Sequence, residues 1–145
     1  MDRMDSADLP EDAIQIVEHT ADWAVRVRGR DLAELFRHAA VGMARLLAGD
    51  LSAVPLVEER ALALESYDAE GLLVDWLGEL AYWAERDGLV FPAIALTDLT
   101  ATALRSVVRG GRAPELQKHI KAVTYHDLAI RQHDEGFEVT IVFDV

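Results

Sequence analysis

The chain of 145 residues contains no cysteine and carries a formal net charge of −12 at pH 7. This length fits one domain with its own core, and the lack of cysteine excludes disulfides and thiolate metal sites. The charge disfavours direct contact with nucleic acid phosphates and favours a basic protein partner or a cation. The alternative is that the acidity only keeps the protein soluble.

Residues 1–13 are polar and acidic, and we expect them to form a flexible lead-in to a single domain over residues 14–145. They hold no apolar run of the kind found in signal peptides. No later stretch of the sequence is long and apolar enough to span a bilayer. We therefore expect a cytoplasmic protein.

The first clear elements are a strand and a helix. Apolar and polar residues alternate over Trp23–Arg28, which predicts a strand. From Leu32 to Leu47 the apolar residues recur every three or four positions, which predicts an amphipathic helix. Asp31 can cap its start, Glu34 can complete a capping box, and Gly49 can end it.

A second helix is predicted over Leu72–Ala84, with Asp68 as its amino-terminal cap and Gly88 as its stop. Further short strands are predicted at Ala61–Leu64, Leu104–Arg109, Val123–Ile130 and Phe137–Phe143, with a hairpin turn at 134–136. Runs of strands with few helices between them favour an α+β fold. We expect a mostly antiparallel sheet with the two helices packed on one face.

The usual enzyme motifs are missing, including glycine-rich phosphate loops, a His-Glu-x-x-His helix and a nucleophile elbow. The five histidines are scattered. We expect His38, on the polar side of the first helix, and His133, beside the turn, to be solvated. His19 and His126 each closely precede an aspartate, which leaves a structural role and a supporting role in a site both open.

The acidic residues offer a second kind of site. Asp22 precedes a predicted strand, and Asp144 stands next to the final residue, Val145. Two side-chain carboxylates and a main-chain carboxylate would suit calcium or magnesium if the fold brought them together. The simpler alternative is that each of these groups is solvated.

Several short motifs, in this order, resemble the archease family. They are Glu18–Asp22 (EHTAD), Asp31–Phe36 (DLAELF), Leu72–Leu80 (LLVDWLGEL), Lys121–His126 (KAVTYH) and Phe143–Val145 (FDV). The resemblance covers most of the chain, from about Ile16 to Val145. It departs at Trp23, where smaller aliphatic residues are common in the family, and in the segment before Ile14.

This resemblance implies an accessory protein that is not itself an enzyme. Archeases promote guanylylation of RtcB-type RNA ligases, and so their turnover, in tRNA splicing and RNA repair. The resemblance also implies a bound divalent cation, with calcium expected and magnesium or manganese as alternatives. The matching ligands here are Asp22, Asp144 and Val145, whereas Lys121, His19 and His126 are candidates for contact with the partner or for support of the site.

Other interpretations remain open at this point. One is a chaperone-like protein-binding module without ligase specificity, which would need exposed apolar surface. Another is a small metal-dependent hydrolase using Asp22 and a nearby histidine. Neither direct nucleic acid binding nor membrane binding is expected, unless the basic residues form a local patch. Those residues are Arg105, Arg109, Arg112, Lys118 and Lys121.

Overall fold

The computed structural model describes residues 13–18 and 22–145. Two sheets and two long helices make up this part of the chain. The elements follow in the order β1 (Ile14–Glu18), β2 (Asp22–Gly29), α1 (Leu32–Ala48), η2 (a 3-10 helix, Leu51–Ala53), β3 (Glu58–Glu65), α2 (Ala69–Asp87), β4 (Leu89–Leu99), β5 (Ala103–Arg112), β6 (Ala122–Thr124), β7 (Arg131–His133) and β8 (Gly136–Asp144).

The first sheet, here called sheet A, is built around the pair β2 and β8. Its strand order is β1-β2-β8-β6, and β7 pairs with the beginning of β8. Every pairing is antiparallel, and the β2–β8 register runs from Asp22 opposite Asp144 to Gly29 opposite Phe137. The second sheet, sheet B, has the order β3-β5-β4 and is also antiparallel.

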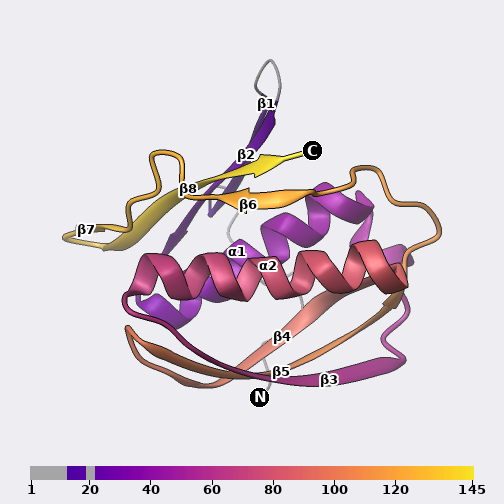
Figure 1. The fold of residues 1–145 in the computed structure, drawn as a ribbon, viewed down its shortest axis with the longest axis horizontal. Helices are drawn as coiled ribbons and strands as arrows, with labels where there is room; N and C mark the ends of the chain where they lie inside the picture. Colours follow the sequence, from indigo (N-terminus) through magenta and orange to yellow (C-terminus); the bar gives the residue numbers. More distant parts are fainter. Residues whose placement is uncertain (1–12, 19–21) are drawn as a thin grey trace.

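The two helices lie between the two sheets (Figure 1). Helix α1 contacts both β2 of sheet A and β4 of sheet B. The α+β class with mostly antiparallel strands is therefore confirmed. The division into two sheets was not predicted, because it depends on pairing β2 with a strand at the far end of the sequence.

The ends of α1 follow the local chemistry that the sequence predicts. The Asp31 carboxylate accepts a hydrogen bond from the Glu34 N–H at 2.8 Å. In return, the Glu34 carboxylate accepts from the N–H of Arg30 at 3.0 Å, one residue before the cap itself. Gly49 ends the helix with a φ of 74°, and its N–H donates to the Arg45 carbonyl.

Helix α2 begins and ends in a similar way. The Asp68 carboxylate accepts from the Gly71 N–H at 2.7 Å, which satisfies a helix-end donor. Gly88 adopts the left-handed conformation with a φ of 70° and donates to the Ala84 carbonyl at 2.9 Å. Both predicted helices are thus confirmed, with their boundaries correct to within a few residues.

The core between the sheets is centred on the contact of α1 with α2. Trp76 is fully buried, and its indole N–H donates to the carbonyl of Phe36 at 3.0 Å. Trp83 meets Phe91 of β4 edge-on, with 5.5 Å between the ring centroids. A buried indole that bonds the neighbouring helix fixes the relative position of α1 and α2 as well as filling space.

Two local predictions are wrong. His38 is buried rather than solvated, because α1 lies between two sheets and is covered on both sides. The predicted strand Val123–Ile130 ends at Thr124, because the Leu128 N–H donates to the Tyr125 carbonyl and closes a turn. Asp127, inside that turn, has a φ of 51°.

The expected lead-in of residues 1–13 falls outside the described residues, apart from Ala13. Ala13 is buried, and its carbonyl accepts from the Arg28 N–H at 3.0 Å. Among the helices that the structure describes, none has the length and apolar character needed to cross a membrane.

Candidate functional site

Asp22 and Asp144, here called the acid pair, lie directly opposite each other at one end of the β2–β8 pairing. Asp22 begins β2 and Asp144 ends β8. Opposed residues of antiparallel strands project from the same sheet face, with their Cβ atoms about 4.5–5.5 Å apart. The fold thus brings together two carboxylates that are at opposite ends of the domain's sequence.

The register that creates the acid pair is fixed by the core. Val25 and Val27 of β2 are fully buried, as are Ile141 and Phe143 of β8. A slip of one residue would turn these side chains to the other face of the sheet, which makes alternative registers costly. The position of the acid pair therefore follows from the packing of its apolar neighbours.

The two carboxylates differ in their surroundings. Asp22 is half-buried, and its Oδ1 atom is shielded from solvent, whereas Asp144 is exposed. Two like charges directly opposed across a sheet destabilise each other. A cation between them would relieve this repulsion, so the pair suits a hard cation that takes oxygen ligands.

Val145 follows Asp144 and packs partly against the core. No group of three or more histidine, aspartate or glutamate side chains with metal-site geometry occurs in residues 13–18 and 22–145. The acid pair supplies two carboxylates, and the resemblance described above implies a third ligand at Val145. The donor chemistry of these three groups fits a calcium or magnesium ion.

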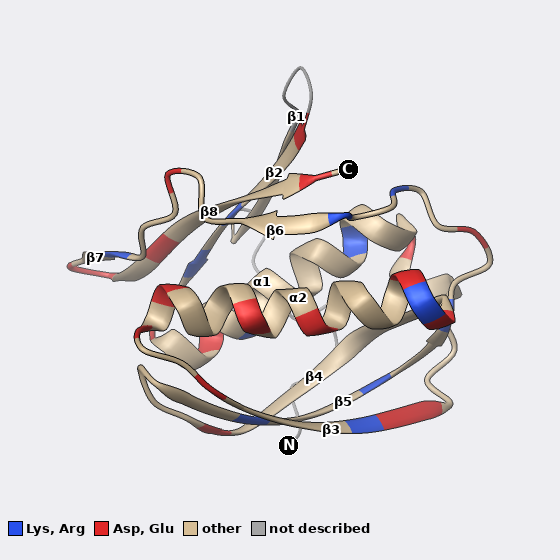
Figure 2. Cartoon of the chain, viewed as in Figure 1, with Lys and Arg blue, Asp and Glu red and all other residues tan. Residues whose placement is uncertain are grey.

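Lys121 lies beside the acid pair. Its N–H donates to the main-chain carbonyl of Asp144 at 2.7 Å, and the next residue, Ala122, is opposite Asp144 in the sheet. Figure 2 shows this juxtaposition as a basic position where β6 begins and an acidic position where β8 ends. The motif that contains Lys121 is thus placed next to the acid pair by strand pairing.

Trp23, next to Asp22 in the sequence, contacts a residue that the sequence analysis did not connect with it. The ammonium group of Lys118 lies 4.3 Å from the centroid of the Trp23 ring, a cation–π contact. Lys118 belongs to the connection between β5 and β6. No sequence pattern indicates this contact, because the two residues meet only after sheet A has formed.

The candidate histidines do not join the acid pair in the described structure. His126 is exposed, its N–H donates to the Thr124 hydroxyl, and its Nε2 lies 3.2 Å from the carboxylate of Asp127. These contacts are local to the turn after β6. His19 lies outside the described residues.

The basic residues do not form one patch over the described chain. Arg105 and Arg109 lie on β5 of sheet B, opposite Asp98 of β4 and Glu59 of β3, respectively. Lys118 contacts β2 of sheet A instead. The arrangement gives no support to a single phosphate-binding surface built from these residues.

Comparisons with known proteins cover nearly the whole of the described chain. Residues 15–145 match the archease protein family (MTH1598/TM1083). The chain is 34% identical to the protein archease of Saccharolobus islandicus strain M.14.25, over 92% of this chain and 99% of the relative. It is 33% identical to that of Methanosarcina acetivorans, with 90% and 94% covered, respectively.

Solved structures give the same result at the level of the fold. The solution structure of Methanobacterium thermoautotrophicum protein 1598 superposes with a TM-score of 0.75 at 27% identity, covering 92% of this chain and 99% of that one. A Thermotoga maritima crystal structure, described as an archease and possible chaperone, superposes with a TM-score of 0.60. At 23% identity, over 90% of this chain and 96% of that one, the second likeness concerns the fold alone.

Proposed function

This chain belongs to the archease family, and from that premise we propose that it activates an RtcB-type RNA ligase. In this proposal the protein is an accessory factor, and the ligase performs the chemistry of joining RNA ends in tRNA splicing and RNA repair. The protein would raise the rate at which the ligase becomes guanylylated. The cytoplasm, where such ligases work, is the proposed location.

The observation that carries the proposal is the acid pair. The sequence motifs that contain Asp22 and Asp144 are far apart, yet the register of sheet A sets the two residues opposite each other. Lys121, from a third motif, is bonded to the same strand end. Three motifs that meet at one corner of a sheet would form a compact surface for a partner.

In the proposed mechanism, the protein helps to align the reacting groups in the active site of the ligase. Guanylylation requires a nucleophilic histidine of the ligase, metal ions and nucleotide phosphates to be aligned. Asp22, Asp144 and the Val145 main-chain carboxylate would hold a divalent cation, which would supply positive charge near those phosphates. Lys121, exposed beside them, would contact a phosphate or an acidic group of the ligase.

The test is single-turnover guanylylation of the cognate ligase with and without this protein. We expect a faster reaction with the wild type and little stimulation with Asp22→Asn/Asp144→Asn. A matched control is Asp75→Asn, which removes an exposed carboxylate from α2. Equal rates with and without the wild-type protein would contradict the proposal.

The role of Val145 has its own test. Residues added after Val145 would convert its main-chain carboxylate into an uncharged peptide group. We expect calcium affinity, measured by titration calorimetry, to fall in such a variant, whereas an extension at the other end of the chain should leave it unchanged. Equal affinity in both extended proteins would remove Val145 from the proposed ligand set.

The chaperone-like alternative has weaker support in this structure. A general client-binding protein needs a broad exposed apolar surface. The exposed large apolar side chains of the described residues are spread along the chain, and only Leu56 and Val57 are neighbours in sequence. They are Ile16, Leu56, Val57, Tyr67, Tyr82 and Tyr125. Binding of unrelated unfolded proteins that persists in Asp22→Ala would favour the alternative.

A further inference from the structure

A second polar site lies at the other end of sheet A, where α1 begins and the β7–β8 hairpin turns. A cavity of about 640 Å³ is found here. Its walls include the end of β2, the first turns of α1 and the hairpin. Its volume falls within the range of small-ligand sites, about 300–1,000 Å³.

His38 is the most informative wall residue of this cavity, because it is only 2% exposed. Its Nδ1 faces the carbonyl of Arg28, which can only accept, so Nδ1 must carry the proton and donate. Nε2 of the neutral ring is then an acceptor. No described residue donates a hydrogen bond to it.

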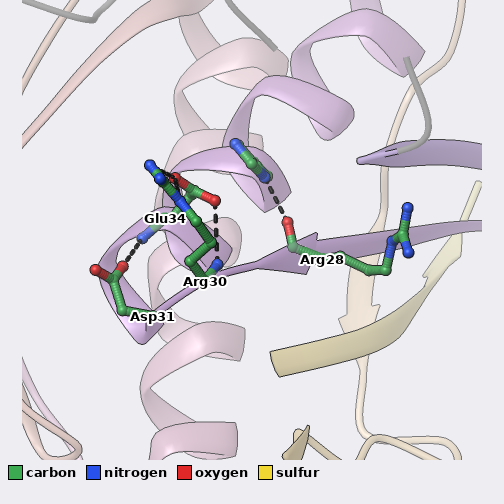
Figure 3. A network of polar contacts seen from close by, with 5 residues as sticks. Arg28, Arg30, Asp31 and Glu34 are labelled. Carbon is green, nitrogen blue, oxygen red and sulfur yellow. Dashed lines mark hydrogen bonds and ion pairs between the residues drawn. The ribbon is translucent and has the colours of Figure 1, made fainter. Parts of the chain in front are cut away.

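One carboxylate near His38 is matched within the protein. Figure 3 shows Glu34 held by Arg30, with the guanidinium at 3.0 Å from the carboxylate, next to the cap formed by Asp31. Burial raises the pKa of Glu34, but the hydrogen bonds from Arg30 outweigh it, and the pKa lies below its usual value. Glu34 is therefore an anion already matched to its own cation.

The hairpin contributes further carboxylates to the cavity. Glu138 is opposite Arg28 in the sheet. Asp134 and Glu135, in the turn, line the same cavity, and no cation of the described residues pairs with them. The walls together hold four carboxylates and two guanidinium groups, so the cavity has a net negative charge.

This chemistry selects the class of ligand. The excess of carboxylates disfavours an anion. The described residues provide no group of three histidine or carboxylate side chains arranged for a metal ion. A guanidinium group, with five N–H donors in a rigid plane, can bond both a carboxylate and a neutral imidazole nitrogen.

We propose that this cavity binds an arginine side chain from a basic segment of a protein partner. The guanidinium donates to Nε2 of His38 and to the carboxylates of Asp134 and Glu135. A protein segment fits better than a free amino acid, because the cavity has room for neighbouring residues and the net charge of −12 attracts basic proteins. The inference does not depend on the partner being an RNA ligase.

The experiment is an NMR titration of the full chain with the peptide acetyl-Ala-Arg-Ala-amide. We expect saturable shifts of the His38 ring nitrogens and of the β7–β8 amides. The same peptide with citrulline, which is uncharged but similar in shape, should bind at least about tenfold more weakly, since the charge-assisted hydrogen bonds are lost.

Matched variants locate the site. Asp134→Asn/Glu135→Gln changes two exposed turn residues and should weaken binding by about tenfold or more. Glu65→Gln, at a separate cavity beside sheet B, should leave binding unchanged. The proposal is overturned if the arginine peptide gives no saturable shift, if citrulline binds equally well, or if the shifts cluster at the acid pair.

Discussion

The two ends of the β2–β8 pairing make opposite use of charge. At one end, Asp22 and Asp144 place like charges directly opposite each other across the sheet. At the other end, Glu34 is matched by Arg30, and Glu138 is opposite Arg28. The opposed carboxylates suit the divalent cation that we propose for them, whereas Glu34 is already paired with Arg30 within the protein. We therefore propose that the two ends of this strand pair bind ligands of different chemistry.

The largest effect is expected at Gly136, at the end of the β2–β8 pairing where the β7–β8 hairpin turns. The backbone of Gly136 lies close to that of Gly29 there. Gly136 has a φ of 137°, and a Cβ atom there would lie 2.2 Å from the carbonyl oxygen of Gly29. We expect Gly136→Ala to destabilise the fold by about 3 kcal/mol in urea unfolding, because both the conformation and the space exclude a side chain. Gly78→Ala, with open space around it, is the matched control.

The next largest effect is expected at the acid pair, at the opposite end of the β2–β8 pairing. We expect Asp144→Asn to lower calcium affinity about tenfold in titration calorimetry, since one anionic ligand is lost. The free energy of unfolding without calcium should not fall, because the repulsion across the sheet is relieved. A loss of stability without calcium would show that Asp144 is a structural residue rather than a cation ligand.

A smaller effect is expected at the start of α1, which supports the hairpin end. Asp31→Ala removes the acceptor for the Glu34 N–H and should cost about 1 kcal/mol of unfolding free energy in urea titrations. Asp31→Asn keeps an acceptor oxygen and should cost less. Equal losses in the two variants would mean that the charge, rather than the cap, is responsible.

The smallest effect is a pH dependence through His38. Burial lowers the pKa of His38 below its usual value of 6.5, and the Arg28 carbonyl and Glu34 oppose this shift only in part. The unfolded chain therefore takes up a proton more readily than the folded chain. The stability from neutral His38 is present above about pH 6.5 and decreases as the pH falls below it.

Urea unfolding at about pH 7.5 and about pH 5.5 measures this loss. His38→Gln keeps a side-chain N–H for the Arg28 carbonyl but cannot take up a proton in this range. The loss of stability between the two pH values should therefore be smaller in this variant. If His38→Gln lost as much stability between the two pH values as the wild type, groups other than His38 would be responsible for the pH dependence.

Sequence reasoning was most successful where the information is local. The caps at Asp31 and Asp68 and the stops at Gly49 and Gly88 depend on a few neighbouring residues, and all four were predicted. The pairing of β2 with β8 depends on residues more than a hundred positions apart, and composition cannot indicate it. The acid pair was therefore proposed as a set of residues, but its geometry came only from the register.

The burial of His38 shows the same limit. Its helix has an obvious apolar stripe, and His38 lies off that stripe. The prediction of a solvated ring assumed one sheet on one side of α1, whereas the helix contacts two. The cavity of the hairpin end could not be predicted for the same reason, since its walls come from elements that meet only in the folded chain.

The β2–β8 pairing also has a consequence for how the molecule assembles. The Arg26 side chain bonds the Thr140 hydroxyl across a sequence separation of 114 residues. Closing so long a loop is entropically costly and slow, so the central pairing of sheet A should form late in folding. Sheet B and the helices, whose partners are nearer in sequence, can form first. The acid pair would then exist only in chains that have finished folding, and cation binding would report the completed native state.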